Sequence, residues 1–287
     1  MKVLIVGSNG QLGWELQRTI PQGIDISAVD MPQIDITNPE SIAGVMDRAI
    51  PDWVINCAAY TNVDGAESDR DAAHAINCEG AGNLARAVSR AGARLVHIST
   101  DFIFSGEGSR PYRPEDVPAP QSVYGRTKLD GEKAVKQVLE EDTLIIRTAW
   151  LYSSHGNNFV HTMIRLMKEK PALTVIDDQI GTPCWARGLA EAVWASVEKR
   201  LAGIFHWTDA GAASWYDFAV AIQEEALAAG LLKKKIPVAP IPTRAYPTPA
   251  RRPAYSVLDK TGTWEATGLS PCHWRKQLRI MIGEINR

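Results

Sequence analysis

The sequence of 287 residues predicts an α/β fold, in which a doubly wound parallel sheet carries a smaller, partly helical second domain. Short runs rich in Val and Ile recur along the first half of the chain, as in strands buried on both faces. Segments with helix signals separate these runs, and this alternation implies right-handed crossovers. A glycine-rich turn follows the first run, which places a ligand site at the start of the sheet.

The strands expected in the sheet are KVLIVG (2–7), IDISAVD (24–30), DWVINCAA (52–59), ARLVHIST (93–100) and TLIIRTAW (143–150). Helix signals lie between them. TNPESIAGVMDRA offers a polar cap from Thr37 and then Pro39 in the first helical turn. NCEGAGNLARAVSRAG ends at a glycine, where a helix would stop.

The alternation loosens after about residue 150. Helix-like stretches follow, NFVHTMIRLMKEK, ARGLAEAVWASVEKRL and DFAVAIQEEALAAG, and then the proline-rich segment 237–253. We interpret that segment either as a rigid linker or as an extended border of a ligand cleft. We interpret DDQIGTP and the helix after it as a part of the chain that belongs to the sheet domain again. The sheet domain is therefore assigned residues 1–150 and about 174–203, and the second domain about 151–173 and 204–287.

Composition excludes several classes of partner. The chain is 45% hydrophobic and 22% charged with a net charge of −2, so it has no basic footprint for nucleic acid or an anionic membrane. The N-terminal apolar run breaks at glycines, so neither a signal peptide nor a membrane span is expected and the predicted location is cytoplasmic. The 4 cysteines are far apart, which argues against zinc and a disulfide framework.

The turn GSNGQLG after the first strand has the spacing GxxGxxG rather than GxGxxG. The physics is the same, because small residues let the pyrophosphate of a dinucleotide approach free N–H groups at a helix N-terminus. The alternative is a plain glycine turn. The expected contacts are Gly7, Asn9, Gly10, Gln11, Leu12 and Gly13.

Asp30 closes the second strand, where an acid normally binds the ribose hydroxyls of the cofactor. This position favours NAD, because a 2′-phosphate would meet a carboxylate and no Arg or Lys follows closely. A turn aspartate at a strand end is the alternative. Further cofactor contacts are expected from Asp35 and Ile36 at the adenine, and from Ala58, Ala59 and Tyr60 after the third strand.

The fourth strand ends in HISTDFIF, which places Thr100 and Asp101 at the carboxyl edge of the sheet. The next helix begins with SVYGRTK, so Tyr124 and Lys128 lie one helical turn apart on one face. The ordinary pKa of tyrosine is about 10, and a neighbouring ammonium is expected to lower that pKa. Tyr124 would then give a proton to a carbonyl oxygen that Thr100 polarises, while Lys128 also holds the nicotinamide ribose. Taken alone, the pair also suits an ordinary surface helix.

The glycine loop, the strand-end threonine and YxxxK, in this order, resemble the short-chain dehydrogenase/reductase superfamily, and GxxGxxG marks its extended members. The runs VINCAAYTNVDGAE, STDFIFSGEG, VYGRTKLDGEKA, RTAWLY and YPTPARRPAYSVLD resemble the dTDP-4-dehydrorhamnose reductase family across nearly the whole chain. This resemblance implies a Rossmann domain and a nucleotide-sugar substrate domain. It implies reduction of the C4 ketone of a dTDP-linked 4-keto-6-deoxy sugar, dTDP-4-dehydro-L-rhamnose. It ranks NADPH first with NADH as the alternative, in mild conflict with Asp30.

By the same resemblance Thr100, Tyr124 and Lys128 are the expected catalytic residues. The expected substrate contacts are Val63, Thr100, Asp101, Phe102, Trp150, Asn158 and Arg252. A core aromatic, a helix cap and a solvated loop are equal alternatives for the last three. Phe102 departs from the family, which reads Tyr there, so one hydrogen bond worth roughly 0.5–1.5 kcal/mol is lost and the exact sugar stays open.

Some relatives bridge two subunits with Mg through acidic helix residues, and Glu15 and Glu191 match these only by position. We expect no metal, because glutamates on helix surfaces are commonplace, and a homodimer stays open. Phe102 also stands where nucleotide-sugar dehydratases need Glu, which disfavours that chemistry. An epimerase with retained NAD, or a regulatory subunit of the same fold, is the remaining alternative.

Overall fold

The computed structural model describes residues 1–140 and 142–285. Its described part contains a 6-stranded sheet with the order β10-β5-β4-β3-β1-β2, and every neighbouring pair in it is parallel. The strands are β1 (Lys2–Val6), β2 (Asp25–Val29), β3 (Trp53–Asn56), β4 (Arg94–Thr100), β5 (Thr143–Thr148) and β10 (Gly203–His206). The doubly wound fold and the strands expected before residue 150 are confirmed. Strand β10 was not predicted, and its short run GIFH follows the long helix α8 (Ala186–Glu198).

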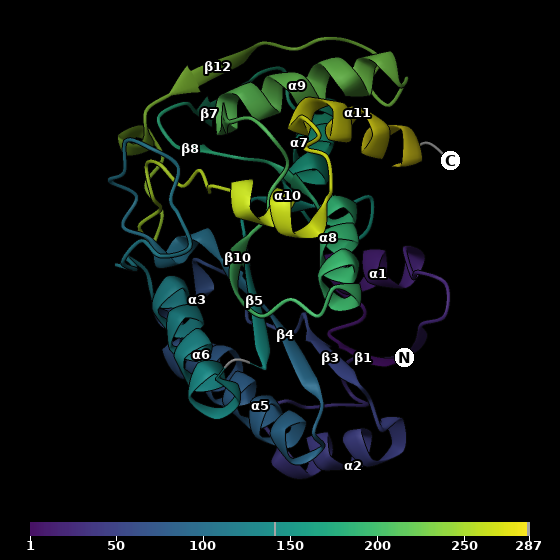
Figure 1. The fold of residues 1–287 in the computed structure, drawn as a ribbon. Coiled ribbons are helices and arrows are strands. Elements are labelled where there is room, and N and C mark those ends of the chain that lie inside the picture. Colours follow the sequence, from purple (N-terminus) through teal and green to yellow (C-terminus); the bar gives the residue numbers. More distant parts are fainter. Residues whose placement is uncertain (141, 286–287) are drawn as a thin grey trace.

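Helices cover both faces of this sheet (Figure 1). One face carries α2 (Pro39–Ala49), α5 (Ala81–Arg90) and α6 (Val123–Leu139), and the other carries α1 (Gln11–Arg18) and α8 (Ala186–Glu198). The strands bury Val, Leu and Ile against both layers, as the continuous apolar runs predicted. At the start of α2 the cap is Asn38, whose side chain accepts from the backbone N–H groups of Glu40 and Ser41.

The crossover from β3 to α5 is a broken helix. It consists of α3 (Gly65–Ser68), α4 (Arg70–His74) and the π-helix η1 (Ala75–Gly80). Asn77 in η1 donates from Nδ2 to the Thr127 hydroxyl of α6 at 3.1 Å, and α6 packs closely on η1. This contact helps to fix the position of α6 along its own axis beside the sheet.

A second lobe gathers around its own apolar core, above the sheet in Figure 1. Its main helices are α7 (Phe159–Glu169), α9 (Trp215–Ala228) and α11 (Trp274–Ile285). Short strands pair around them: β6 (Leu151–Tyr152) with β9 (Cys184–Trp185), β7 (Leu173–Ile176) with β12 (Val238–Ile241), and β8 (Ile180–Gly181) with β11 (Ala213–Ser214). The 3₁₀ turn η3 (Thr243–Ala245) follows β12. The short helix α10 (Thr261–Thr267) packs on α8 and β10, and the 3₁₀ turn η2 (Asp101–Ile103) follows β4. Met163, Phe218 and Leu278 lie in this core.

The proline-rich segment 237–253 is packed against the body of the protein. Its first part contains β12, which pairs with β7, and Arg252 near its end forms an ion pair with Asp64 after β3. These contacts argue against a free linker, but no described residue of this segment lines the ligand cavity described below, so they do not establish a cleft border either. No helix in the described part of the chain is both long enough and apolar enough to cross a bilayer.

Candidate active site

A cavity of about 900 Å³ opens at the carboxyl edge of the sheet. It lies where the chain order reverses between β1 and its neighbours β2 and β3, the switch point at which open α/β sheets bind ligands. The ends of β1, β2, β3 and β4, the first turns of α6 and the chain after β5 all contribute to its lining. The glycine loop, the strand-end threonine and the YxxxK pair therefore face one space.

The glycine loop leaves the N-terminus of α1 open toward this cavity. Gly10 is the N-cap, and no side chain caps the helix there. Asn9, Gly10, Gln11, Leu12 and Gly13 line the cavity together with Gly7. Any side chain at Gly13 would clash, because its Cβ would lie 2.3 Å from the Gly7 carbonyl oxygen. Uncapped N–H groups and the helix dipole fit the diphosphate of a dinucleotide.

Asp30 lines the cavity and also fixes the loop. Its Oδ2 accepts from the Asn9 N–H at 2.8 Å, and its Oδ1 accepts from the Met31 N–H at 2.8 Å. Each oxygen keeps a second lone pair for a ribose hydroxyl. Lys128 is the only Lys or Arg among the described residues of the lining, so no cation lies ready for a 2′-phosphate near Asp30.

The other residues expected at the cofactor divide into two groups. Asp35, Ile36, Ala58 and Ala59 line the cavity. Tyr60 lies outside the lining, because its backbone N–H and carbonyl are both bound to the Asn77 amide and its ring packs near Val123.

The fold presents Tyr124 and Lys128 to the cavity from the first turns of α6. Ser122 caps this helix by accepting from the Gly125 N–H. A Cβ at Gly125 would lie 2.2 Å from the Phe102 carbonyl oxygen, so only glycine lets α6 approach η2, the turn after β4, this closely. The YGRTK stretch therefore specifies the helix position as well as the two polar side chains.

The expectation that Lys128 lowers the pKa of Tyr124 is wrong. Burial raises the pKa of Tyr124 to about 12, with a hydrogen bond to Thr100 opposing and the charge of Asp101 reinforcing that shift. The Lys128 ammonium is turned away to the backbone, where it donates to the Ile98 carbonyl at 2.7 Å. Desolvation of the phenolate outweighs a cation that makes no direct contact, so Tyr124 is held as a neutral phenol.

Lys128 is itself strongly perturbed. Burial lowers its pKa to about 8, and the carboxylate of Glu132 opposes that shift. Glu132 lies one turn further along α6 and forms a buried bidentate ion pair with Arg147 of β5, at 3.0 and 2.8 Å. The same carboxylate accepts from the Ser99 hydroxyl at 2.5 Å, which ties α6 to the end of β4.

Thr100 and Asp101 form a hydrogen-bonded pair at the cavity floor. The Thr100 hydroxyl donates to Asp101 Oδ1 at 3.1 Å and accepts from the Phe102 N–H at 3.2 Å. Burial raises the pKa of Asp101 to about 6, against hydrogen bonds that lower it. The Thr100 hydroxyl can therefore donate to a ligand only by turning away from Asp101.

On the sugar side, Val63, Phe102 and Trp150 line the cavity. The Phe102 ring meets the Tyr124 ring edge-on, with centroids 5.5 Å apart at 75°. Trp150 has a left-handed backbone, φ 45°, and its ring stacks on Trp215 at 3.6 Å. Trp150 is thus half-buried between the cavity and the second lobe.

Asn158 and Arg252 lie outside the cavity lining. Asn158 caps α7 by accepting from the His161 N–H, and its amide donates to the Gln11 side chain at 3.1 Å. Arg252 donates through two nitrogens to the Asp64 carboxylate at 3.0 and 2.8 Å. Contact with a ligand would require either side chain to exchange a partner that it already has.

Somewhat fewer than half of the residues that line the cavity were not predicted. Most of the missed residues follow the same strand ends as the predicted ones, so strand-end position was the available signal. They include Met31, Ile34, Thr37, Cys57, Thr61, Ile76, Ile98, Thr148, Ala149, Leu151 and Gly156.

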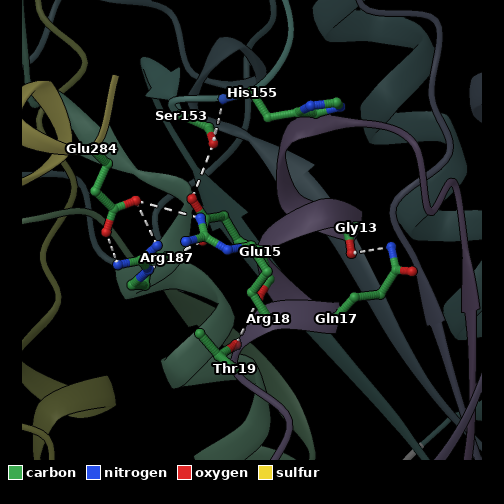
Figure 2. A network of polar contacts seen from close by, with 9 residues as sticks. All are labelled: Gly13, Glu15, Gln17, Arg18, Thr19, Ser153, His155, Arg187 and Glu284. Atoms are coloured by element: carbon green, nitrogen blue, oxygen red, sulfur yellow. Dashed lines mark hydrogen bonds and ion pairs between the residues drawn. The ribbon is translucent and has the colours of Figure 1, made fainter. Parts of the chain in front are cut away.

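Glu15 does not lie on the helix surface as expected. Its side chain is fully buried, accepting from Ser153 at 3.0 Å and from Arg187 at 3.1 Å (Figure 2). Glu191 is exposed. Across residues 1–140 and 142–285, no group of His, Cys, Asp and Glu side chains is arranged to hold a metal ion.

Comparison with known proteins identifies the family. The model of the RmlD substrate binding domain matches residues 1–287. A dTDP-4-dehydrorhamnose reductase of Burkholderia thailandensis is 41% identical over 298 residues, which cover 99% of each chain. The crystal structure of a dTDP-4-dehydrorhamnose reductase from Clostridium acetobutylicum has a TM-score of 0.94 at 41% identity, covering 100% of both chains. One from Bacillus anthracis, solved in complex with NADP, has a TM-score of 0.93 at 38% identity over 99% of each chain. The chain belongs to the dTDP-4-dehydrorhamnose reductase family.

Proposed function

We propose that this protein reduces the C4 ketone of dTDP-4-dehydro-L-rhamnose with NADPH and forms dTDP-L-rhamnose. The observation that carries the proposal is the convergence of Thr100, Tyr124 and Lys128 on one cavity whose other end is the glycine loop. Relatives that match nearly the whole chain are named as reductases of this sugar.

The cofactor end of the site consists of Gly7 and residues 9–13, with Asp30, Asp35, Ile36, Ala58 and Ala59 toward the adenosine. When bound, the nicotinamide supplies the hydride. The Bacillus anthracis relative was solved with NADP, which ranks NADPH first. Asp30 faces the cavity without a cation beside it, which supports NADH as the second cofactor. Lys128 is proposed to hold the nicotinamide ribose.

Tyr124 is proposed to deliver the proton. Because burial holds its phenol in the neutral form, with a pKa of about 12, it carries a proton at neutral pH. The alkoxide that forms on the sugar is more basic than a phenolate, so transfer from Tyr124 to that oxygen is downhill. The positive charge of Lys128 within the same buried site then stabilises the phenolate that remains.

Thr100 is proposed to polarise the ketone. Its hydroxyl donates to Asp101 in this structure, and turning the hydrogen toward the substrate oxygen would add a second donor beside Tyr124. The Oδ1 of Asp101, a buried residue of the same cavity lining, would then be left to accept from another donor such as a sugar hydroxyl.

The sugar is proposed to bind between the sheet domain and the second lobe. Val63, Phe102 and Trp150 surround the cavity beyond Tyr124, and Trp150 leads directly into β6 of the lobe. The separate apolar core of that lobe supports its role as the substrate domain. The chain is proposed to leave the sheet domain for the second time after His206, because β10 belongs to the central sheet.

The test is the absorbance of NADPH during incubation of the purified protein with dTDP-4-dehydro-L-rhamnose, with NADH in parallel and product identification. Consumption of reduced cofactor matched by dTDP-L-rhamnose supports the proposal. Interconversion of sugars without net consumption would instead identify an epimerase. Binding without turnover of either cofactor would identify a non-catalytic member of the fold.

A further inference from the structure

A loop from the second lobe lies against the glycine loop, although nothing in its sequence resembles a phosphate-binding motif. Residues 153–158, called here the 153–158 loop, follow β6 and end at the cap of α7. His155 Nε2 lies 2.9 Å from the Asn9 carbonyl oxygen. At the two ends of the loop, Asn158 donates to Gln11 and Ser153 donates to Glu15. Gly156 and Asn157 between these contacts line the cavity beside Gly10 and Gln11.

His155 makes two separable contacts with this region. Because a carbonyl oxygen only accepts, His155 Nε2 must carry the hydrogen and donate to Asn9. The imidazole ring also stacks on the Trp14 ring of α1, with centroids 5.0 Å apart and planes 11° apart. Figure 2 shows the His155 ring extending from beside Ser153 over the start of α1.

The hydrogen bond from His155 completes the restraint on Asn9. The Asn9 N–H donates to Asp30 at 2.8 Å, so the peptide groups on both sides of this residue are held by side chains. The N–H of the Asn9–Gly10 peptide donates to the Gly7 carbonyl at 3.3 Å. The bond from His155 therefore holds the other polar group of the same peptide at a flexible glycine. Fixing the Asn9–Gly10 peptide therefore keeps the N–H groups of the turn and of α1 oriented toward the cavity.

The 153–158 loop is anchored on its other side by the core of the second lobe. Val160 and Met163 of α7 are buried in that core. His161 Nε2 lies 3.2 Å from the Ser154 carbonyl and so donates back into the loop. The 153–158 loop thus connects the glycine loop to α7 of the second lobe through hydrogen bonds at several points.

We propose that His155 is a positioning residue for the cofactor pyrophosphate, acting through its hydrogen bond to Asn9, and that the 153–158 loop forms one wall of the pyrophosphate site. The inference rests on the proposed dinucleotide cofactor. It adds a residue of the second lobe to a site otherwise formed by the sheet domain.

Two matched variants separate the two contacts of His155. His155→Phe keeps a ring to stack on Trp14 but has no donor, and His155→Gln keeps an N–H donor but has no ring. Binding of NADPH and of ADP-ribose, which contains the pyrophosphate, is measured by calorimetry, with adenosine as the ligand that lacks phosphate. Melting temperatures establish that both variants fold, and steady-state assays separate KM from kcat.

We expect His155→Phe to weaken NADPH and ADP-ribose binding about five- to tenfold, the range of one lost hydrogen bond. Adenosine binding and kcat at saturating NADPH should stay within about twofold of wild type, since the residue acts on the pyrophosphate loop alone. His155→Gln should recover most of the lost affinity.

Wild-type affinity of His155→Phe for ADP-ribose would overturn the inference and leave the proposed function intact. Equal losses in both variants would also overturn it, by assigning the effect to the stack on Trp14. If the wild-type protein binds neither NADPH nor ADP-ribose, the proposed function fails and this inference fails with it.

Discussion

The ammonium of Lys128 donates to the backbone carbonyl of Ile98, 2.7 Å away, beneath the end of β4. This bond ties the only Lys or Arg of the described cavity lining to the backbone of the strand. Lys128 makes no hydrogen bond to Tyr124 in the described structure, and the pKa of the phenol is set by burial, Thr100 and Asp101. Substitutions of Tyr124 and of Lys128 should therefore have different effects on catalysis.

Tyr124→Phe should remove the proton donor and leave the rest of the cavity in place. We expect kcat to fall roughly 10²- to 10⁴-fold, the usual contribution of a positioned acid, with the dissociation constant for NADPH within about threefold of wild type. Steady-state kinetics and calorimetric titration measure the two quantities. Wild-type turnover in this variant would remove Tyr124 from the proton path.

Activity should decline as pH rises through about 8, the pKa to which burial lowers Lys128. Above that pH the ammonium is lost, so the free enzyme no longer stabilises a phenolate. The measurement is kcat/KM against pH. Lys128→Arg keeps its charge throughout this range, so whatever activity it retains should lack the alkaline decline. An unchanged decline in Lys128→Arg would assign it to another group.

The same titration predicts how stability changes with pH. The pKa of Lys128 is lowered on folding from 10.5 to about 8, so between these values the unfolded chain binds more protons than the folded one. Titration of Lys128 should therefore increase the free energy of unfolding as pH rises across that window. Urea unfolding of wild type and Lys128→Met at several pH values isolates this contribution, because Met does not titrate. A difference between them that does not vary with pH would contradict the shift.

Asp30 should set the preference between the two cofactors. Asp30→Asn keeps an oxygen to accept from the Asn9 or Met31 N–H but removes the charge that a 2′-phosphate would face. The ratio of kcat/KM for NADPH over NADH should rise about tenfold, which corresponds to about 1.4 kcal/mol. Kinetics with both cofactors measure this ratio. A ratio equal to wild type would show that Asp30 does not face the adenosine ribose.

Much of this site could be predicted because the responsible residues are coded locally. The glycine loop, Asp30 and Thr100 each follow a strand, and strand ends meet at one edge of a parallel sheet. YxxxK is coded within one helical turn. Those features required only the strand and helix periods.

What the sequence could not predict depends on contacts between distant segments. The partner of Arg252 is Asp64, and the donor to Asn9 is His155, pairs that no local pattern connects. The pKa of Tyr124 was predicted in the wrong direction because a helical spacing reveals a neighbour but not the burial around it. Likewise Glu15 was not expected to be buried, because its partners Arg187 of α8 and Ser153 of the 153–158 loop are distant in the sequence.

Phe102→Tyr should test whether a phenol at this position contacts the sugar. The ring already packs edge-on against Tyr124, so a tyrosine keeps the packing and adds one hydroxyl at the cavity. If the hydroxyl finds a partner on the substrate, kcat/KM should rise by up to about tenfold, the value of one hydrogen bond. Phe102→Leu serves as the control, because it removes the edge-on ring and should lower activity. A fall in kcat/KM for Phe102→Tyr would show that this cavity is shaped for a ring without a hydroxyl.

The buried pair of Glu132 and Arg147 should stabilise the protein only while both partners are present. Each side chain is 3% exposed, and together they join α6 to β5, with Glu132 one helical turn after Lys128. Glu132→Gln leaves the guanidinium of Arg147 without its counter-charge, which should cost about 3–5 kcal/mol of unfolding free energy. Arg147→Met should cost a similar amount for the opposite reason. The double variant removes both charges, so its loss should be smaller than the sum of the two single losses.

Activity separates a purely structural pair from one that also serves the site. Glu132 opposes the burial-induced lowering of the Lys128 pKa, so its replacement by Gln should shift the alkaline decline of kcat/KM to lower pH. Urea unfolding of the two single variants and the double variant gives the coupling energy, and a pH profile of Glu132→Gln gives the electrostatic effect. Additive stability losses would show that the two charges do not stabilise each other. An unmoved pH profile would confine the pair to holding α6 against the sheet.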